Sequence, residues 1–360
     1  MFTTRFTQLV DIQYPIVQAG MAGGITTPKL VASVSNAGGL GTIGAGYLNP
    51  DSLRTAIRAV KELTNRPFGV NLFVVQETLP NEEEMERMNR HLDPIREMLG
   101  IETRQQIDRY SESFEDQIQV VLDEHVPVFS FTFGIPLQEV LKHLKHHRIV
   151  VLGTATTVDE ALQLEASGVD AIVVQGSEAG GHRGTFGTSA MAALVGTMAL
   201  VPQVVDHVCV PVIASGGIMD GRGLIASLAL GASAVQMGTA FVPCVESGAH
   251  ELYKEAVLRS HEDATQITFA YSGKAARGIR TKFMQEIDGY PGKIPPYPVQ
   301  NALTQDIRQA AAKQRNPEYM SLWAGQGVRL TTNRTAQAIV QECVQEALAA
   351  LAHLDAQRNV

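Results

Sequence analysis

The chain has 360 residues, 45% of them hydrophobic and 32 of them glycine, so it can bury a full core and still carry an appendage. Lysine and arginine total 29 against 37 acidic residues, a net charge of −8, and no basic stretch is long enough to follow a nucleic-acid backbone. The longest apolar stretch, Ala190 to Val201, falls short of a bilayer span, so we expect neither a nucleic-acid nor a membrane partner.

The N-terminal stretch MFTTRFTQLV lacks the apolar core and small-residue cleavage site of a secretory signal, and we therefore expect a cytoplasmic protein. The cysteines are too few for a disulfide scaffold and have no metal-ligand spacing, so we expect reduced, buried thiols and no metal at Cys209, Cys244 and Cys343.

Short apolar runs alternate with helical stretches along residues 1–243, which predicts an α/β fold of the (β/α)8 TIM-barrel type. Most of the runs are continuously apolar, as expected of parallel strands that are covered on both faces. The predicted strands are Ile16 to Ala19, Leu40 to Ile43, Phe68 to Phe73, Val128 to Phe131, Ile149 to Leu152, Ala171 to Val174, Val212 to Ala214 and Ala234 to Met237. The predicted crossover helices are Pro28 to Ser35, Asp51 to Leu63, Pro136 to His143, Thr157 to Ser167 and Arg222 to Leu230.

Three regions exceed the barrel. The stretch from Gln76 to Glu115 is charged and helical in pattern, too long for a simple connection, and predicts an inserted helical flap at about 76–116. Residues 244–330 lose strand periodicity and contain a proline-rich turn at Gly289 to Pro298, which predicts a smaller, mainly helical cap domain over the barrel mouth. In residues 331–360 we expect a last helix, Thr335 to Ala352, that packs back onto the barrel.

The segment Gly39 to Gly44 contains a GxGxxG pattern, which occurs in dinucleotide-binding folds. Here the pattern spans a predicted strand and does not open a helix. Its glycines are better explained by close packing or by approach of the backbone to a cofactor.

Glycine turns follow the last three predicted strands. The turn at Gln175 to Gly184 (QGSEAGGHRG) brings His182, and two further turns read SGGI from Ser215 and QMGT from Gln236. Glycine lets backbone N–H groups approach an anion, helix N-termini carry partial positive charge, and such barrels bind phosphate after strands seven and eight. We therefore predict a phosphate site on the same rim as His182, formed by Ser215, Gly216, Gly217, Gln236, Met237, Gly238 and Thr239.

Eight distinctive motifs are spread over nearly the whole chain. They are Gln18 to Gly24 (QAGMAGG), Ser35 to Gly46 (SNAGGLGTIGAG), Phe68 to Phe73 (FGVNLF), Gln175 to Gly184, Ser215 to Arg222 (SGGIMDGR), Gln236 to Phe241 (QMGTAF), Ser272 to Ile279 (SGKAARGI) and Leu322 to Gly327 (LWAGQG). Together they resemble the nitronate monooxygenases, long called 2-nitropropane dioxygenases, which share a fold with flavin-dependent enoyl-ACP reductases. The MAGG, SNAGGLG and GVNLF stretches are more similar to the monooxygenases than to the reductases.

The resemblance implies an FMN-binding barrel whose phosphate lies on Gly217 and on the turn from Gln236 to Thr239. It further implies that the loop at Gly20 and Met21 lies against the flavin ring and that His182 faces the substrate. The remaining implied cofactor contacts come from Asn71, Gln175 and Gly180, with Gly181 beside them.

The reaction implied is oxidation of alkyl nitronates, such as propionate 3-nitronate, by O₂ to carbonyl compounds and nitrite. His182 would stabilise charge at the nitro group, or act as general base if neutral nitroalkanes are also used. The expected partners are the small-molecule nitronate and O₂, and the expected state is a monomer or homodimer.

Alternatives remain open. A related barrel could be an NAD(P)H-dependent flavin reductase acting on an enoyl thioester or a quinone, and the chain could also bind a flavin without turnover. A barrel of the inosine monophosphate dehydrogenase type is disfavoured, because that chemistry needs a nucleophilic cysteine in a rim loop and none of the three cysteines is placed there.

Other reactive side chains have ordinary explanations. We expect a loop-stiffening ion pair or solvated charges at Glu178 and Arg183, solvated cap residues at Lys274 and Arg277, a solvated helix end without metal at His143, His146 and His147, and either packing or a pocket wall at Tyr319 and Trp323.

Overall fold

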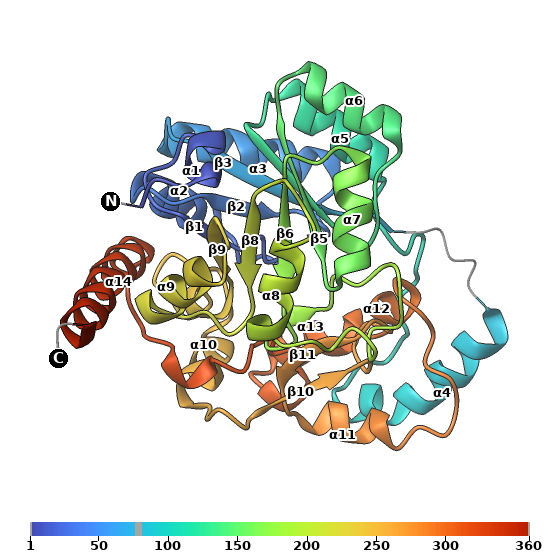
Figure 1. Cartoon of the computed structure of the whole chain (residues 1–360). Coiled ribbons are helices and arrows are strands. Elements are labelled where there is room, and N and C mark those ends of the chain that lie inside the picture. The colour runs from blue at the N-terminus through green and yellow to red at the C-terminus, as the bar shows by residue number, and fades with distance from the viewer. Residues whose placement is uncertain (1, 76–80, 359–360) are drawn as a thin grey trace.

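The computed structural model describes residues 2–75 and 81–358, and at its centre lies an eight-stranded parallel sheet (Figure 1). A parallel bridge between Val17 and Leu40 joins the two end strands, so the sheet closes into a barrel and the predicted (β/α)8 fold is confirmed. In spatial order the strands are β1 (Ile16–Gln18), β9 (Ala234–Met237), β8 (Val212–Ser215), β6 (Ala171–Gln175), β5 (Val150–Ala155), β4 (Val128–Thr132), β3 (Phe68–Phe73) and β2 (Gly41–Gly44).

Side chains on the two faces of the strands enter different cores. Ile172 and Val174 face outward and pack beneath the helices, whereas Val173 and Ile213 pack inside the barrel with Phe6 of the short helix α1 (Arg5–Val10). Helix α1 therefore covers the amino-terminal end of the barrel and leaves the carboxyl end for a site. The helices around the barrel are α2 (Pro28–Asn36), α3 (Pro50–Leu63), α5 (Phe114–Asp123), α6 (Gln138–His146), α7 (Val158–Ser167), α8 (Thr197–Val205) and α9 (Gly221–Ala229).

The predicted insertion contributes helix α4 (Glu82–Met98), and its residues 76–80 lie outside the described part of the chain. Helix α4 packs on the C-terminal region, where Met88 and Leu92 join a second hydrophobic core. Arg96, only 4% exposed, donates from Nε to Asp306 at 2.7 Å, which ties α4 to helix α13 (Gln305–Lys313).

The region after the barrel contains a feature that the sequence reading missed. Strands β10 (Thr265–Thr268) and β11 (Ala276–Ile279) form an antiparallel hairpin, and β7 (Gly181–His182) from the barrel rim pairs with β11. These strands are short and carry no alternating apolar pattern, so periodicity could not reveal them. Around the hairpin lie the helices α10 (Glu251–Arg259), α11 (Lys282–Asp288), α12 (Val299–Leu303) and α13.

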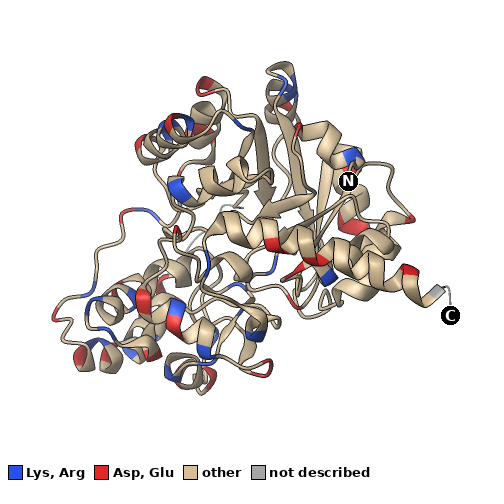
Figure 2. Cartoon of the chain, turned by 90° about the vertical axis from the view of Figure 1, so that its left-hand side faces the viewer, with Lys and Arg blue, Asp and Glu red and all other residues tan. Residues whose placement is uncertain are grey.

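The last helix, α14 (Ala336–Arg358), lies along α9 on the outside of the barrel (Figure 1). The two backbones approach closely at Gly221, where a Cβ would stand 2.2 Å from the amide nitrogen of Ala347. Charged residues of both signs are interspersed over the barrel and the helices below it (Figure 2). None of the described helices is long and apolar enough to cross a membrane.

Candidate active site

A cavity of about 1230 Å³, its open mouth included, lies at the carboxyl end of the barrel strands. Its walls come from the loops after the strands and from the C-terminal region, including Trp323.

Residues far apart in the sequence meet at this cavity. Every predicted site residue except Met237 lines it, namely Gly20, Met21, Asn71, Gln175, Gly180, Gly181, His182, Ser215, Gly216, Gly217, Gln236, Gly238 and Thr239. Met237 is a correction: it is 1% exposed and packs in the outer core, because alternation along β9 turns its side chain away from its neighbour Gln236.

The two glycine turns form a cradle of backbone amides. Gly216 and Gly217 have φ values of 119° and 71°, which favour glycine. The N–H groups of Gly216, Gly217 and Thr239 donate to no acceptor within residues 2–75 and 81–358. Gly217 is exposed, and Gly216 and Thr239 are half-buried. Backbone amides left free in glycine turns at a cavity wall can bind an anion, so this cradle has the chemistry of an anion site.

We expected the N-terminus of the helix after β8 to offer free amides to the anion, and for α9 this expectation is wrong. The amides of its first two residues already have acceptors, because Gly221 N–H donates to Glu346 at 3.0 Å and Arg222 N–H donates to Asp220 at 3.0 Å. An anion in the cradle would therefore be held by the loops before the helix.

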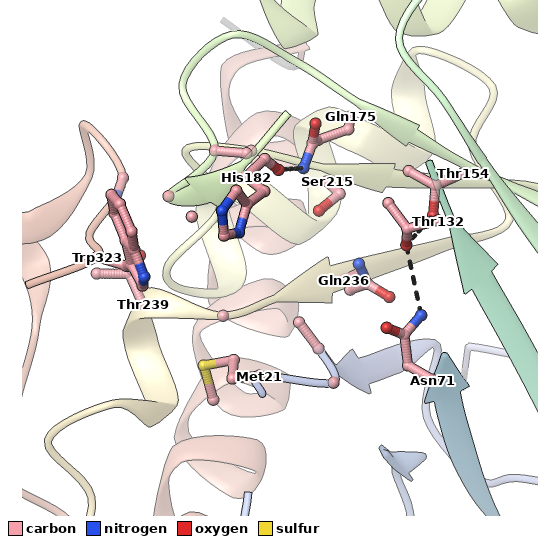
Figure 3. A pocket seen from close by; sticks show the side chains of 18 of the residues that line it. Met21, Asn71, Thr132, Thr154, Gln175, His182, Ser215, Gln236, Thr239 and Trp323 are labelled. Atoms are coloured by element: carbon pink, nitrogen blue, oxygen red, sulfur yellow. Dashed lines mark hydrogen bonds between the residues drawn. The ribbon is translucent and has the colours of Figure 1, made fainter. Parts of the chain in front are cut away.

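A row of polar side chains crosses the cavity wall. Asn71 Nδ2 donates to Ser130 Oγ at 2.9 Å and lies 3.5 Å from Thr132 Oγ1, which in turn lies 3.4 Å from Thr154 Oγ1 (Figure 3). These amide and hydroxyl groups suit the ring edge and hydroxyl chain of a flavin nucleotide.

Gln175 uses both ends of its amide within the protein. Its Nε2 donates to the carbonyl oxygen of His182 at 3.0 Å, and its Oε1 accepts from Gly184 N–H at 2.8 Å (Figure 3). Gln175 lines the cavity, but its hydrogen bonds hold the loop that carries His182. The second N–H of its Nε2 and the second lone pair of its Oε1 are not used in these two bonds, so its contact with a cofactor stays a prediction.

His182 lies in the loop after β6 and lines the cavity. It belongs to β7, opposite Ala276 of β11, and its Nε2 lies 2.8 Å from Ser272 Oγ. Desolvation, together with the smaller effects of the nearby cations Lys274 and Arg308, lowers the pKa of His182 to about 3. At neutral pH this imidazole is uncharged, so it can accept or donate a hydrogen bond but does not act as a cation.

Three aromatic rings lie around His182, which is half-buried at the cavity wall. Ring centroids lie 5.4 Å away at Trp323, 5.7 Å at Phe133 and 5.9 Å at Tyr297. Figure 3 shows the indole of Trp323 next to the imidazole of His182. Trp323 is therefore a pocket wall, whereas Tyr319 is 2% exposed, donates to Glu286 and packs within the C-terminal region.

The sequence reading missed three residues of the site: Arg308, Tyr47, which lines the cavity, and Tyr297, whose ring contacts His182. Arg308 donates from Nη2 to the carbonyl oxygen of Asn301 at 2.6 Å and from Nε to that of Thr304 at 3.3 Å. Within the described chain its Nη1 has no acceptor, and it lines an outer chamber together with His182. A single arginine in the amphipathic stretch QDIRQAAAK has no sequence signal that distinguishes it from a surface residue.

The charged residues of the neighbouring loops are not solvated, contrary to expectation. Lys274 Nζ lies 4.6 Å from the Phe133 ring centroid and donates to Thr185 O at 3.0 Å. Arg183 is 0% exposed and Arg277 8% exposed. Glu178 accepts from Thr197 N–H and hydroxyl at 2.9 and 2.8 Å, so it orders the start of α8.

The remaining motifs have structural explanations. A Cβ at Gly44, within the GxGxxG pattern, would lie 2.3 Å from the carbonyl carbon of Met21, so this glycine permits close packing of the loop after β1. His143, His146 and His147 are exposed at the end of α6, and no potential metal-binding cluster is found in the described residues. Cys209 is exposed, contrary to our expectation, whereas Cys244 and Cys343 are buried.

Comparison with known proteins gives consistent matches. A family described as nitronate monooxygenase matches residues 3–346. A probable nitronate monooxygenase of Staphylococcus saprophyticus is 49% identical over 347 residues, 96% of this chain and 98% of that protein. A Staphylococcus aureus (strain MSSA476) protein of the same name is 50% identical over 343 residues, covering 95% and 96%.

Solved structures agree in fold. Nitroalkane oxidase from Streptomyces ansochromogenes matches with a TM-score of 0.91 and 39% identity, over 97% of this chain and 99% of that one. FabK from Thermotoga maritima matches with a TM-score of 0.79 and 33% identity, over 99% of this chain and 100% of that one.

Proposed function

The chain belongs to the nitronate monooxygenase family of oxidoreductases, and we propose that it uses FMN and O₂ to oxidise alkyl nitronates to carbonyl compounds and nitrite. One observation carries the proposal: a cradle of unpaired backbone amides and a half-buried, neutral His182 line the same cavity. The first suits a phosphate, and the second suits a small reacting group above a flavin ring.

The residues present fit FMN. Gly216, Gly217 and Thr239 would hold the phosphate, while Asn71 and the loop at Gly20 would contact the ring or its polyol chain. Bound FMN supplies the capacity to accept electrons from the substrate. The protein's own tasks are to bind the nitronate, orient it and keep water away.

The positive charge that an anionic nitronate needs cannot come from neutral His182. We infer that it comes from Arg308, whose Nη1 is free to donate and whose chamber adjoins His182. His182 would orient the nitronate through a hydrogen bond to one of its oxygens, with Ser272 fixing which ring nitrogen carries the proton. With a neutral nitroalkane, the same unprotonated imidazole would take the α-proton, but a pKa of about 3 makes it a weak base, so we expect slower turnover than with the nitronate.

An NAD(P)H-dependent flavin reductase is the second candidate, and the similarity to FabK favours it. It ranks lower because the TM-score to FabK is 0.79, against 0.91 for the nitroalkane oxidase. A flavin-binding protein without turnover ranks lowest, since it gives the reactive-site histidine no role.

Substitution of the histidine tests the proposal. We expect His182→Ala to retain FMN, because its imidazole is not part of the amide cradle, and to lose about 100-fold or more in kcat/KM with ethyl nitronate. Oxygen uptake and nitrite formation measure the loss, and His146→Ala, at an exposed position on α6, is the control. Undiminished turnover by His182→Ala would refute the role given to this residue.

A further inference from the structure

Two buried arginines behind the amide cradle have no carboxylate partner among residues 2–75 and 81–358. Arg183 is 0% exposed, and its guanidinium donates to carbonyl oxygens, those of Gly176 at 2.6 Å, Gln175 at 3.0 Å and Ala193 at 3.1 Å. Its Nε is buried without a partner in the described structure. A buried cation without a counter-ion is costly, so this arrangement calls for an explanation.

The second arginine, Arg277, binds the next carbonyl of the loop that follows β6. Arg277, in β11, donates from Nε to Ser177 O at 3.0 Å and from Nη1 to Thr265 Oγ1 at 3.3 Å. The two side chains therefore bind three consecutive carbonyls, those of residues 175, 176 and 177. Burial and repulsion by Arg277 lower the pKa of Arg183 to about 10, which agrees with two neighbouring cations.

The nearest carboxylates are used elsewhere. Glu178 accepts from Thr197 at the start of α8. Glu160 accepts from Thr156 and from the N–H groups of Phe186 and Gly187, each at 2.7 Å. Neither forms an ion pair with the two arginines, so their charge is offset only in part.

A chain of hydrogen bonds leads from Arg183 to the cradle. Arg183 Nη2 binds the carbonyl of the peptide between Gln175 and Gly176, and the N–H of that peptide donates to Ser215 O at 2.8 Å. The carbonyl of Ser215 belongs to the peptide between Ser215 and Gly216. The N–H of that second peptide is the Gly216 amide, which has no acceptor among the described residues. Aligned hydrogen bonds polarise one another, so the guanidinium strengthens the Gly216 amide as a donor.

We propose that Arg183 and Arg277 form an indirect counter-charge for the terminal phosphate of the cofactor, acting through the peptide groups of the loop and not by contact. The proposal rests on FMN being the cofactor. It explains how a cradle without a lysine or arginine at its surface can hold a dianion. Because neither side chain lines the cavity, both are positioning residues for the loop amides.

Riboflavin, which is FMN without its phosphate, separates an electrostatic role from a merely structural one. Apoprotein is titrated with FMN and with riboflavin, following quenching of flavin fluorescence. For Arg277→Met we expect FMN affinity to fall about tenfold or more and riboflavin affinity to change less than about twofold. Arg277→Lys keeps the charge and should recover most of the FMN affinity.

Arg183→Met should show the same selective loss, and its fold is checked by thermal unfolding. The less buried Arg277 carries the test if Arg183→Met does not fold. Arg96→Met removes a buried guanidinium that contacts α13 and controls for general destabilisation.

Equal weakening of FMN and riboflavin, or unchanged FMN affinity in both methionine variants, would overturn the counter-charge. If the wild-type protein binds neither flavin, the proposed function fails first and this inference with it. If the wild type binds FMN tightly and the variants do so equally, only the counter-charge is refuted.

Discussion

His182 is positioned by contacts from three separate parts of the chain. Gln175 holds its carbonyl oxygen, β11 pairs with its backbone, and Ser272 contacts its ring nitrogen. The glycine-flanked loop and its histidine could be predicted from sequence, because glycine turns after barrel strands have a local signature. Arg308 and Tyr297 could not, since only the fold brings them near His182.

The desolvation of His182 predicts an unusual pH dependence. Because its pKa in the folded state is about 3, below the ordinary value of 6.5, kcat/KM for nitronate should show no histidine titration between pH 5 and 7. Between pH 6.5 and 3, His182 is protonated in the unfolded chain but not in the folded chain. The free energy of unfolding should therefore fall as the pH falls from 6.5 to 3. Steady-state rates and Tm measured across these ranges check both effects. A rate limb with an apparent pKa near 6.5 that vanishes in His182→Gln would contradict a neutral imidazole.

Arg308 should discriminate between charged and neutral substrates. Its replacement by Met removes the free donor at the outer chamber, so kcat/KM for ethyl nitronate should drop roughly 10- to 100-fold, as for a lost hydrogen bond to a charged group. Neutral nitroethane should be affected much less, and Arg308→Lys should be intermediate. Arg315→Met, at an exposed ion pair with Glu251, is the matched control. Equal losses on both substrates would show that Arg308 maintains structure and does not bind the anion.

At the scale of elements, local sequence predicted the regular parts and missed the pairings between distant segments. All eight barrel strands were located within three residues of their ends, because continuous apolar runs between helices mark buried parallel strands. Strand β7 has two residues and forms only because β11 lies beside it. The cap thus completes the active-site loop by edge pairing, a feature of tertiary structure alone.

The contact between α9 and α14 can be tested at Gly221. By helix propensity alone, Gly221→Ala should stabilise the protein by up to about 1 kcal/mol. The added Cβ would instead stand 2.2 Å from the Ala347 amide, so we expect a loss of about 1–3 kcal/mol in the free energy of unfolding. Denaturant unfolding measures the difference, and Ala226→Val on the exposed face of α9 is the control. A stabilised Gly221→Ala would mean that α14 is not packed closely at this point.

At the scale of the whole molecule, the barrel supplies an amide cradle and polar wall, and the C-terminal region supplies the aromatic enclosure. Helix α4 joins this second part through Arg96 and Asp306, so the insertion is structurally part of the cap. The barrel half of the site was visible in the sequence as glycine turns. The half of the site that the C-terminal region supplies could not be predicted, because its side chains follow no local sequence pattern and meet the barrel only in the folded structure.

Anaerobic reduction of the flavin tests the central claim most directly. Purified protein is reconstituted with FMN, freed of oxygen and mixed separately with ethyl nitronate and with NADH, while the visible absorbance of the flavin is followed. We predict rapid loss of absorbance with the nitronate, none with NADH, and nitrite formation when air is admitted. Rapid bleaching by NADH without reaction of the nitronate would contradict this account and assign the site to a reductase.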